Sequence, residues 1–362
     1  MTGTRAVTVS IDQDALAHNF AQVKQYAPNS KVMPVIKANA YGHGMLQVAG
    51  ALGNADGFAV AQLSEAIELR ESGVDKPLTV FQGISNKLEL ELAVAYRLRP
   101  AISQVWQIDL IESAVSDSSI NGQSLDVWLK INTGMGRLGV QADDVKLARQ
   151  RLAALPCISQ LGLMMHFANA DMPAHTSNQQ QIACFRSLIE EKTTQTSVSN
   201  SGAIISRLYE EEQSWVRPGI MLYGSSPFLD KTAEQLGLQP VMSLQAKLIA
   251  INKLSKGQHV GYGDSWTCPE DMRVGIVNIG YGDGYPRHAS TGTPLAVKGQ
   301  PTQLVGRVSM DSIAVDLRGI NAECGDLVEL WGKYISVDEV AKSAGTISYE
   351  LLCNVGRCSG GI

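Results

Sequence analysis

The chain has 362 residues, a mass of 38.9 kDa and a formal net charge of −5, from 30 Lys and Arg against 35 Asp and Glu. Hydrophobic residues make up 44% of it and charged residues 18%, which excludes the disordered and fibrous classes. The balance of charge gives no signature of a protein that binds nucleic acid or an anionic membrane, and no apolar run approaches the ~18 residues that span a bilayer. Residues 1–9 lack the apolar core of a signal peptide, so we expect a cytoplasmic protein.

Short apolar runs alternate with helical patterns over the first part of the chain. One helical pattern, at 64–70, has Ser64 or its neighbour as a plausible N-cap, and others lie at 88–98, 143–155 and 178–191. Strands separated by helices of this length form parallel βαβ units. Eight of them in about 220 residues predict a (β/α)8 TIM-type barrel, and a doubly wound open sheet is the alternative. The predicted strands are residues 31–36, 57–61, 77–81, 99–103, 125–131, 161–167, 197–199 and 215–216.

The pattern changes after about residue 235, where short apolar runs follow one another closely, separated by Gly and Asp turns. We expect a second, mainly β domain with a single late helix near 336–344. The chain is therefore predicted to be an α/β protein with a barrel at 1–234, whose first few residues pack with the second domain, and a β domain at 235–362. The predicted strands of this domain are residues 241–250, 273–279, 294–297, 303–305, 312–315 and 327–330.

The cysteines carry no sign of a metal site or a disulfide framework. No two of the six form a C-x-x-C pair, and the nearest two have four residues between them and no neighbouring His. We expect scattered reduced thiols, some of them buried, and no bound metal. The six are Cys157, Cys184, Cys268, Cys324, Cys353 and Cys358.

A lysine stands where an active site would form in such a barrel. Lys37 follows the first predicted strand, in the run VIKANAYGHG at 35–44. The carboxyl ends of barrel strands build the active site, and a Lys with a lowered pKa there can react with a carbonyl group or with pyridoxal phosphate. A solvated lysine that merely ends a strand is the alternative for this feature taken alone.

The run at 37–44 resembles the segment that attaches pyridoxal phosphate in the bacterial alanine racemases, which belong to the fold-type III enzymes. The resemblance covers most of the chain. It implies a (β/α)8 barrel followed by a β domain, and a homodimer in which the partner chain completes each active site. Further stretches that carry it, in the family's order, are 130–139, 165–168, 199–201, 216–220, 260–263, 280–287, 308–311 and 348–350.

The resemblance implies a role for each matched residue. Lys37 would hold pyridoxal phosphate and act as the base on one face of the substrate Cα, and Tyr262 of the partner subunit would be the base on the other face. Arg217 would face the pyridine nitrogen, and an arginine cannot accept a proton there. The implied cofactor contacts are Lys37, Tyr41, His166, Asn200, Ser201, Arg217, Gly219, Ile220 and Tyr349.

The same resemblance assigns the substrate carboxylate to Arg137 and to the backbone of Met310, the latter again from the partner chain. Lys130 matches a lysine that is often carbamylated in the family, where the carbamate orients the arginine. The residues that match the entrance and its surroundings are Tyr281, Tyr285, Arg287 and Asp311.

The resemblance thus predicts a pyridoxal-phosphate enzyme that interconverts L- and D-alanine and supplies D-alanine for peptidoglycan. The alternatives are a broader racemase that also accepts serine, a non-catalytic pyridoxal-phosphate-binding homeostasis protein, which would lack a β domain, and a decarboxylase, which would carry an acidic residue in place of Arg217. The end of the chain departs from the family: residues 354–362 read NVGRCSGGI where an Arg-Val-Pro-type segment and a short apolar strand are usual. We expect the last strand to be missing or altered.

Overall fold

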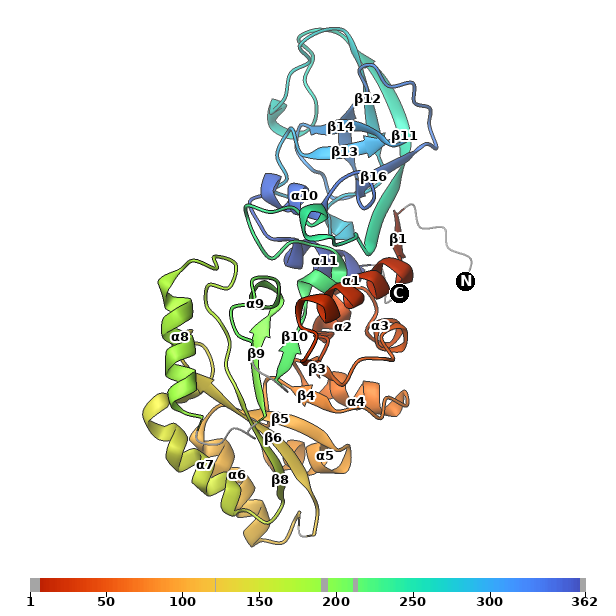
Figure 1. Ribbon diagram of the computed structural model, residues 1–362. Helices are drawn as coiled ribbons and strands as arrows, with labels where there is room; N and C mark the ends of the chain where they lie inside the picture. Colours follow the sequence, from red (N-terminus) through yellow and green to blue (C-terminus); the bar gives the residue numbers. More distant parts are fainter. Residues whose placement is uncertain (1–6, 121, 190–194, 211–213, 359–362) are drawn as a thin grey trace.

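The computed structural model describes residues 7–120, 122–189, 195–210 and 214–358. Two lobes are stacked in Figure 1, with the first two thirds of the chain in the lower lobe and most of the remainder in the upper one. The chain crosses between the lobes more than once, because the first strand lies with the upper lobe and the last helix returns to the lower one.

The lower lobe is a barrel of parallel strands, as predicted. The sheet order is β2-β10-β9-β8-β6-β5-β4-β3. A bridge between Val35 and Ala59 closes the ring, with Ile36 N–H bonding to Ala59 O at 2.9 Å. This closure distinguishes the barrel from a doubly wound open sheet. The strands are β2 (Lys31–Val32), β3 (Phe58–Val60), β4 (Leu78–Val80), β5 (Leu98–Ile102), β6 (Leu125–Asn132), β8 (Ile158–Met164), β9 (Thr196–Asn200) and β10 (Trp215–Arg217), and β7 (Val140–Gln141) adds to the edge of β6.

Helices follow the strands around the barrel (Figure 1). The expected N-cap of the 64–70 helix was wrong. Gln62 is extended, helical geometry begins at Leu63, and the Glu65 carboxylate accepts a hydrogen bond from the Gln62 N–H. The helical segments of this lobe are α1 (Gln13–Tyr26), α2 (Lys37–Tyr41), α3 (Met45–Ala51), α4 (Leu63–Glu71), α5 (Lys87–Ala95), α6 (Val105–Ser116), η1 (Ala142–Asp144), α7 (Val145–Ala154), α8 (Thr176–Ser187), α9 (Ser201–Ile205), η2 (Ile220–Tyr223) and η3 (Glu234–Leu236).

A buried cation lies near the amino ends of the barrel strands. Arg99, the second residue of β5, lies with its guanidinium carbon 5.6 Å from the ring centroids of both Trp128 and Trp215. It pairs with Asp126 at 3.3 Å and donates to Gln160 Oε1 at 2.7 Å. The ion pair, the hydrogen bond and the two tryptophan rings together offset the cost of burying this guanidinium in the barrel interior.

The upper lobe is an antiparallel sheet in the order β1-β11-β12-β15-β14-β13-β16, with β16 returning to pair with β11. Strand β1 comes from the start of the described chain and pairs with β11, with Val7 opposite Ala246. The mainly β second domain is therefore confirmed. Its elements are β1 (Val7–Ile11), β11 (Met242–Leu254), η4 (Tyr262–Asp264), β12 (Met272–Val277), η5 (Tyr281–Asp283), β13 (Pro294–Val297), β14 (Gln300–Val305), β15 (Ile313–Asp316) and β16 (Leu327–Trp331).

Two helices close the described chain, where the sequence predicted one. Helix α10 (Val337–Ser343) is the expected one, and α11 (Ser348–Cys358) is additional. Leu351, Leu352 and Val355 of α11 are buried at helical spacing, and the helix packs against α2. Residues 354–358, where the sequence departs from the family, lie within α11, and residues 359–362 lie outside the described chain.

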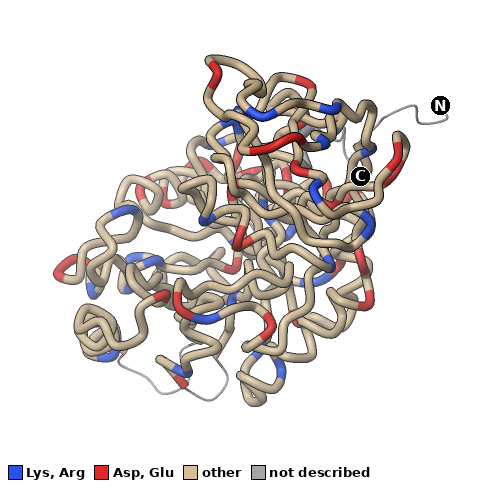
Figure 2. The backbone as a smooth tube through the Cα atoms, turned by 90° about the horizontal axis from the view of Figure 1, so that it is seen from above, with Lys and Arg blue, Asp and Glu red and all other residues tan. Residues whose placement is uncertain are grey.

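Lys and Arg are interspersed with Asp and Glu along the backbone in the view of Figure 2. Among the described residues, no helix is long and apolar enough to cross a membrane, and no group of three or more His, Cys, Asp or Glu side chains could hold a metal ion.

Candidate active site

The carboxyl ends of the barrel strands bring the predicted site residues of the lower lobe together. Lys37 follows the β2 segment, Lys130 lies near the end of β6, His166 lies two residues beyond β8, and Arg217 ends β10. Helices α2 and α11 approach the same region, between the two lobes (Figure 1). This is the face on which barrel enzymes build their active sites.

The turn that carries Lys37 has an unusual backbone. Ala38, Asn39, Ala40 and Tyr41 all lie in the left-handed region, with φ between 53° and 54°. For residues other than glycine this conformation costs about 1–2 kcal/mol each. The turn persists because Ala40 N–H bonds to Ile36 O at 2.9 Å and Met45 N–H bonds to Asn39 Oδ1 at 2.7 Å. Strain of this kind is typical of functional sites.

Two lysines at the site have lowered pKa values. Burial, and next the charge of Arg137, lowers the pKa of the half-buried Lys37. Lys130 is 7% exposed, and burial together with Arg217, Arg137 and Lys37 lowers its pKa to about 8. Within the described chain no carboxylate forms an ion pair with Lys130. The site is therefore a cationic cluster, which suits a ligand with negative charges.

Arg217 is buried and anchored by several acceptors. Its Nη1 donates to Ser197 Oγ at 2.6 Å, and its Nη2 donates to Met165 O at 2.7 Å and to Nδ1 of His166 at 3.2 Å. Burial lowers the pKa of Arg217 to about 9. Burial, and next the charge of Arg217, lowers the pKa of His166 well below its usual range. Arg217 is thus a fixed hydrogen-bond donor, and the His166 imidazole beside it is neutral.

Hydroxyl groups and backbone N–H groups cluster beside α9 and η2. Ser201 Oγ accepts from Gly219 N at 2.9 Å and from Met221 N at 3.4 Å. A Cβ at Gly219 would lie 2.7 Å from the Tyr41 hydroxyl, so only glycine allows this approach. Ile220 opens η2 at the same place. Such a set of donors is typical of a phosphate site.

The Tyr41 ring lies 4.8 Å from the Tyr223 ring and 5.9 Å from the Tyr349 ring, between ring centroids. Burial raises the pKa of Tyr41, Tyr223 and Tyr349, which keeps all three hydroxyls protonated as donors. Tyr349 comes from α11, so the end of the chain contributes directly to the site. Asn200 has a structural task here: its Oδ1 accepts from Ala203 N at 3.1 Å and caps α9.

The loop that carries Arg137 is held by side chains that the sequence analysis did not select. Asn132 Oδ1 accepts from Gly134 N at 3.2 Å and from Gly136 N at 2.9 Å, and Arg137 itself is exposed. Gln181 is buried on α8 and donates to Thr133 Oγ1 at 3.1 Å and to His166 O at 3.0 Å. Nothing in the sequence around Gln181 indicates that its side chain joins Thr133 to His166 by hydrogen bonds.

The predicted site residues of the upper lobe are exposed. Tyr262 is 68%, Met310 55% and Tyr281 39% exposed. Tyr281 N–H bonds to Ser309 O at 3.0 Å and Gly282 N–H to Met310 O at 2.9 Å, which joins the Tyr281 turn to the turn of Met310 and Asp311. In the part of the chain that the structure describes, no hydrogen bond, ion pair or ring contact links Tyr262 or Met310 to Lys37.

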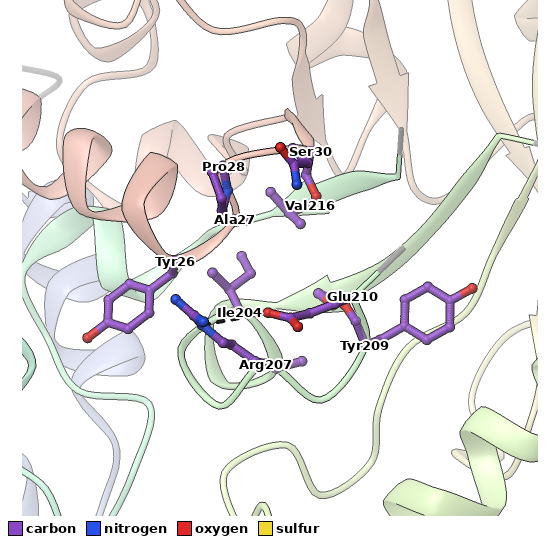
Figure 3. Close-up of a pocket in the computed structure, with 12 residues that line it drawn as sticks. Tyr26, Ala27, Pro28, Ser30, Ile204, Arg207, Tyr209, Glu210 and Val216 are labelled. Atoms are coloured by element: carbon purple, nitrogen blue, oxygen red, sulfur yellow. Dashed lines mark hydrogen bonds and ion pairs between the residues drawn. The ribbon is translucent and has the colours of Figure 1, made fainter. Parts of the chain in front are cut away.

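A separate cavity of about 330 Å³ lies between the loops that precede β2 and β10. Figure 3 shows Tyr26, Arg207 and Glu210 around it, with an Arg207–Glu210 ion pair of 3.6 Å. None of the site residues described above lines this cavity. Its lining also includes Ser199 of β9 and Ala203 and Ile204 of α9, but not Lys37.

The sequence matches two family descriptions that together cover most of it. Residues 11–227 match "Alanine racemase, N-terminal domain" and residues 241–359 match "Alanine racemase, C-terminal domain". The chain is 45% identical over 354 residues to the alanine racemase of Nitrosospira multiformis, covering 97% of this chain and 98% of that one. It is 46% identical over 347 residues to the alanine racemase of Nitrosococcus oceani, covering 95% and 96%.

Solved structures agree over the whole fold. The biosynthetic alanine racemase of Pseudomonas aeruginosa superposes with a TM-score of 0.92 at 42% identity, covering 97% of each chain. The alanine racemase of Acinetobacter baumannii gives a TM-score of 0.86 at 40% identity, again covering 97% of each chain. The resemblance expected from the sequence is thereby confirmed, and the chain belongs to the alanine racemase family of isomerases.

Proposed function

We propose that the chain interconverts L-alanine and D-alanine with pyridoxal phosphate held on Lys37, as a homodimer in the cytoplasm, and supplies D-alanine for peptidoglycan. The observation that carries this proposal is the half-buried Lys37 at a strand end, with a lowered pKa and a cationic surrounding. A neutral amine is the form of lysine that reacts with an aldehyde. The match of the β domain, which a barrel-only binding protein would lack, favours the enzyme.

The residues present fit this cofactor. Ser201, Tyr41 and the backbone N–H groups at Gly219 and Ile220 would hold the phosphate, because their donors lie together beside η2. Arg217 would face the ring nitrogen as a donor, with His166 beside it and Tyr349 packed near Tyr41. When bound, pyridoxal phosphate supplies the electron sink that makes the α-proton of an amino acid acidic.

The chain itself would bind the substrate and move the proton. The exposed Arg137 provides a cation for the substrate carboxylate, together with the backbone of Met310 from the partner chain. Nζ of Lys37 would take the α-proton on one face, and the hydroxyl of Tyr262 from the partner chain would return a proton on the other. In the reverse direction the two groups exchange these tasks.

One feature of the upper lobe supports the shared site. Tyr262, Tyr281 and Met310 are large side chains exposed on one lobe, which is typical of a surface that another subunit covers.

Lys130, buried near Arg217, Arg137 and Lys37, would be repelled by these cations as an ammonium group. We infer that carbon dioxide adds to its neutral amine, so that the resulting carbamate holds Arg137.

The test is the formation of D-alanine from L-alanine by the purified, cofactor-loaded protein, with L-serine in parallel. We expect D-alanine from the wild type and none from Lys37→Ala, with borohydride reduction fixing the cofactor to the Lys37 peptide in the wild type alone. Lys87→Ala, at the start of the barrel helix α5, is the matched control. Comparable turnover of serine would replace the proposal by a broad racemase, and no racemisation of either amino acid would overturn it.

A further inference from the structure

One carboxylate joins the turn of Lys37 to the neighbouring strand. Glu65 Oε1 accepts a hydrogen bond from Ala38 N at 2.6 Å, and Oε2 accepts from Ala61 N at 2.9 Å and Gln62 N at 3.0 Å. Ala61 and Gln62 follow β3, which the bridge between Val35 and Ala59 places next to the segment after β2, and Glu65 lies in the first turn of α4. A single side chain therefore spans two adjacent strand ends and the start of a helix.

The bonded N–H is the one next to Lys37. The peptide that joins Lys37 to Ala38 is where the chain turns from ordinary geometry into the left-handed run of 38–41. The direction in which the Lys37 side chain leaves the backbone depends on this peptide. Charge-assisted hydrogen bonds to a carboxylate are shorter and stronger than neutral ones, so Glu65 is a firm anchor at this position.

The bond from Ala38 N to Glu65 is additional to the bonds that Glu65 makes at the start of α4. Glu89 occupies the corresponding first-turn position of α5, where it accepts from Ser85 N and Ser85 Oγ, both at 2.7 Å. Both carboxylates serve a helix start. Only Glu65 extends to the turn that carries Lys37.

We propose that Glu65 is a positioning residue for Lys37: its carboxylate fixes the left-handed turn to the end of β3 and so aims Nζ at the reacting atoms. The inference rests on the proposed function of Lys37 and deepens it. Glu65 touches neither substrate nor cofactor in this scheme, and it acts through the backbone of Ala38.

The charge of Glu65 gives the proposal a second consequence. Arg137, Glu65 and Cys353 act on Lys37 from three different elements, and Lys37 in turn acts on Lys130 and His166. Burial and Arg137 lower the Lys37 pKa, whereas Glu65 raises it. Loss of the Glu65 charge therefore lowers the pH at which Lys37 becomes a neutral amine.

Three variants separate positioning from helix capping. Glu65→Gln keeps the size of the side chain but removes the charge and turns one acceptor into a donor. Glu65→Asp keeps the charge and an acceptor suited to a helix start, but it is one methylene too short to span to Ala38. Glu89→Gln makes the same chemical change as the first variant at the start of α5.

The first measurement uses trace acetic anhydride, which acetylates only neutral amines, on the full chain before cofactor is added. Mass spectrometry of the Lys37 peptide gives the labelled fraction against pH. We expect the midpoint to move to lower pH in Glu65→Gln and to stay near the wild-type value in Glu65→Asp and Glu89→Gln. A midpoint that is the same in Glu65→Gln and Glu89→Gln would count against the proposal.

The second measurement is steady-state racemisation by the cofactor-loaded enzymes. We expect kcat to fall about tenfold to a hundredfold in both Glu65 variants with little change in KM, because misplacing a reacting group by about 1 Å can cost a factor of about 100. Glu89→Gln should keep the wild-type kcat. Wild-type kcat in Glu65→Asp would overturn the proposal even if Glu65→Gln fails to fold.

These experiments distinguish a failure of the proposed function from a failure of the positioning role of Glu65. If the wild type does not take up the cofactor on Lys37, the proposed function fails. If the wild type is active and the Glu65 variants behave like Glu89→Gln, only the positioning role fails.

Discussion

Nη2 of Arg217 lies 3.2 Å from Nδ1 of His166 and 2.7 Å from Met165 O. Because a guanidinium group only donates, Nδ1 of His166 is the acceptor, and the imidazole is neutral with its proton on Nε2. Burial and the charge of Arg217 lower the pKa of His166, which favours the same form. The hydrogen bond between Arg217 and His166 thus joins the end of β10 to the segment after β8, and no carboxylate takes part in it.

We expect His166 to take up its proton only at a lower pH than an unperturbed histidine does, because burial and the charge of Arg217 lower its pKa. Hydrogen–deuterium exchange at the imidazole C2 position, read by mass spectrometry of the His166 peptide, gives the midpoint directly. The same residue in the urea-unfolded chain is the reference. Arg217→Gln should move the midpoint upward, because it removes a positive charge and leaves the burial. A wild-type midpoint near the usual 6.5 would contradict the neutral form.

The pKa of Lys130 predicts how stability depends on pH. With a folded-state pKa of about 8 against an ordinary 10.5, the folded chain releases a proton that the unfolded chain still holds. The free energy of unfolding should therefore rise as pH rises from about 8 to 10.5, by at most ~3 kcal/mol. Urea unfolding in CO2-free buffer at several pH values measures this rise.

Lys130→Met is the control, because it fills the site without a titratable group. Its stability curve should lack the component between pH 8 and 10.5, and bicarbonate should flatten the wild-type curve by converting the amine to a carbamate. ¹³C-labelled bicarbonate should give a carbamate NMR signal in the wild type and none in Lys130→Met. Equal pH slopes in the two proteins without CO2 would refute the buried, titrating amine.

The barrel could be predicted from the sequence because its strands are buried on both faces and read as continuous apolar runs. The run predicted at 125–131, for example, lies within the barrel strand β6 (Leu125–Asn132). Helix α11 was not predicted because attention went to the departure of residues 354–362 from the family pattern. The cap at Gln62 was not predicted because Ser is a stronger N-cap residue than Gln when the sequence is considered alone.

The residues that we propose for the site also fall into those that the sequence predicts and those that it does not. Lys37 and its matched partners could be selected from motifs at strand ends. Gln181 and Glu65 could not, because each acts on backbone groups that the fold brings close from distant segments. The left-handed run of 38–41 carries only a weak signal, the Asn39 within it and the glycines that follow.

A shared active site predicts complementation between inactive subunits. Lys37→Ala removes the residue that we assign to cofactor attachment, and Tyr262→Phe removes the hydroxyl assigned to the opposite face. Each variant alone should lose nearly all racemisation, and Tyr262→Phe should still take up the cofactor. A mixture in which subunits exchange should regain activity, because a mixed dimer holds one site with both Lys37 and Tyr262.

Subunit exchange is followed independently, with differently tagged chains and native mass spectrometry. Mixed dimers that form without any recovery of racemisation would argue against a site shared between chains. Tyr334→Phe, which removes another exposed tyrosine hydroxyl of the upper lobe, is the matched control and should keep full activity.

The buried Arg99 predicts a loss of stability without a loss of chemistry. Its guanidinium lies between Trp128 and Trp215 and pairs with Asp126, near the strand ends opposite to Lys37. Arg99→Met keeps an apolar stem but removes the cation that pairs with Asp126 and the donor of the 2.7 Å bond to Gln160, so we expect a fall of about 2–3 kcal/mol in the free energy of unfolding.

Arg97→Met is the matched control for Arg99→Met, because Arg97 is 74% exposed and its 3.5 Å pair with Asp75 is on the surface. An exposed pair contributes less than about 1 kcal/mol, so the urea midpoint of Arg97→Met should stay near that of the wild type. Racemisation at 25 °C should be unchanged in both variants, because neither arginine lies among the strand ends that carry Lys37 and Arg217. Equal midpoints for the two variants would show that the cation between the tryptophans does not stabilise the barrel, and a fall in kcat in Arg99→Met would show that the two ends of the barrel are coupled.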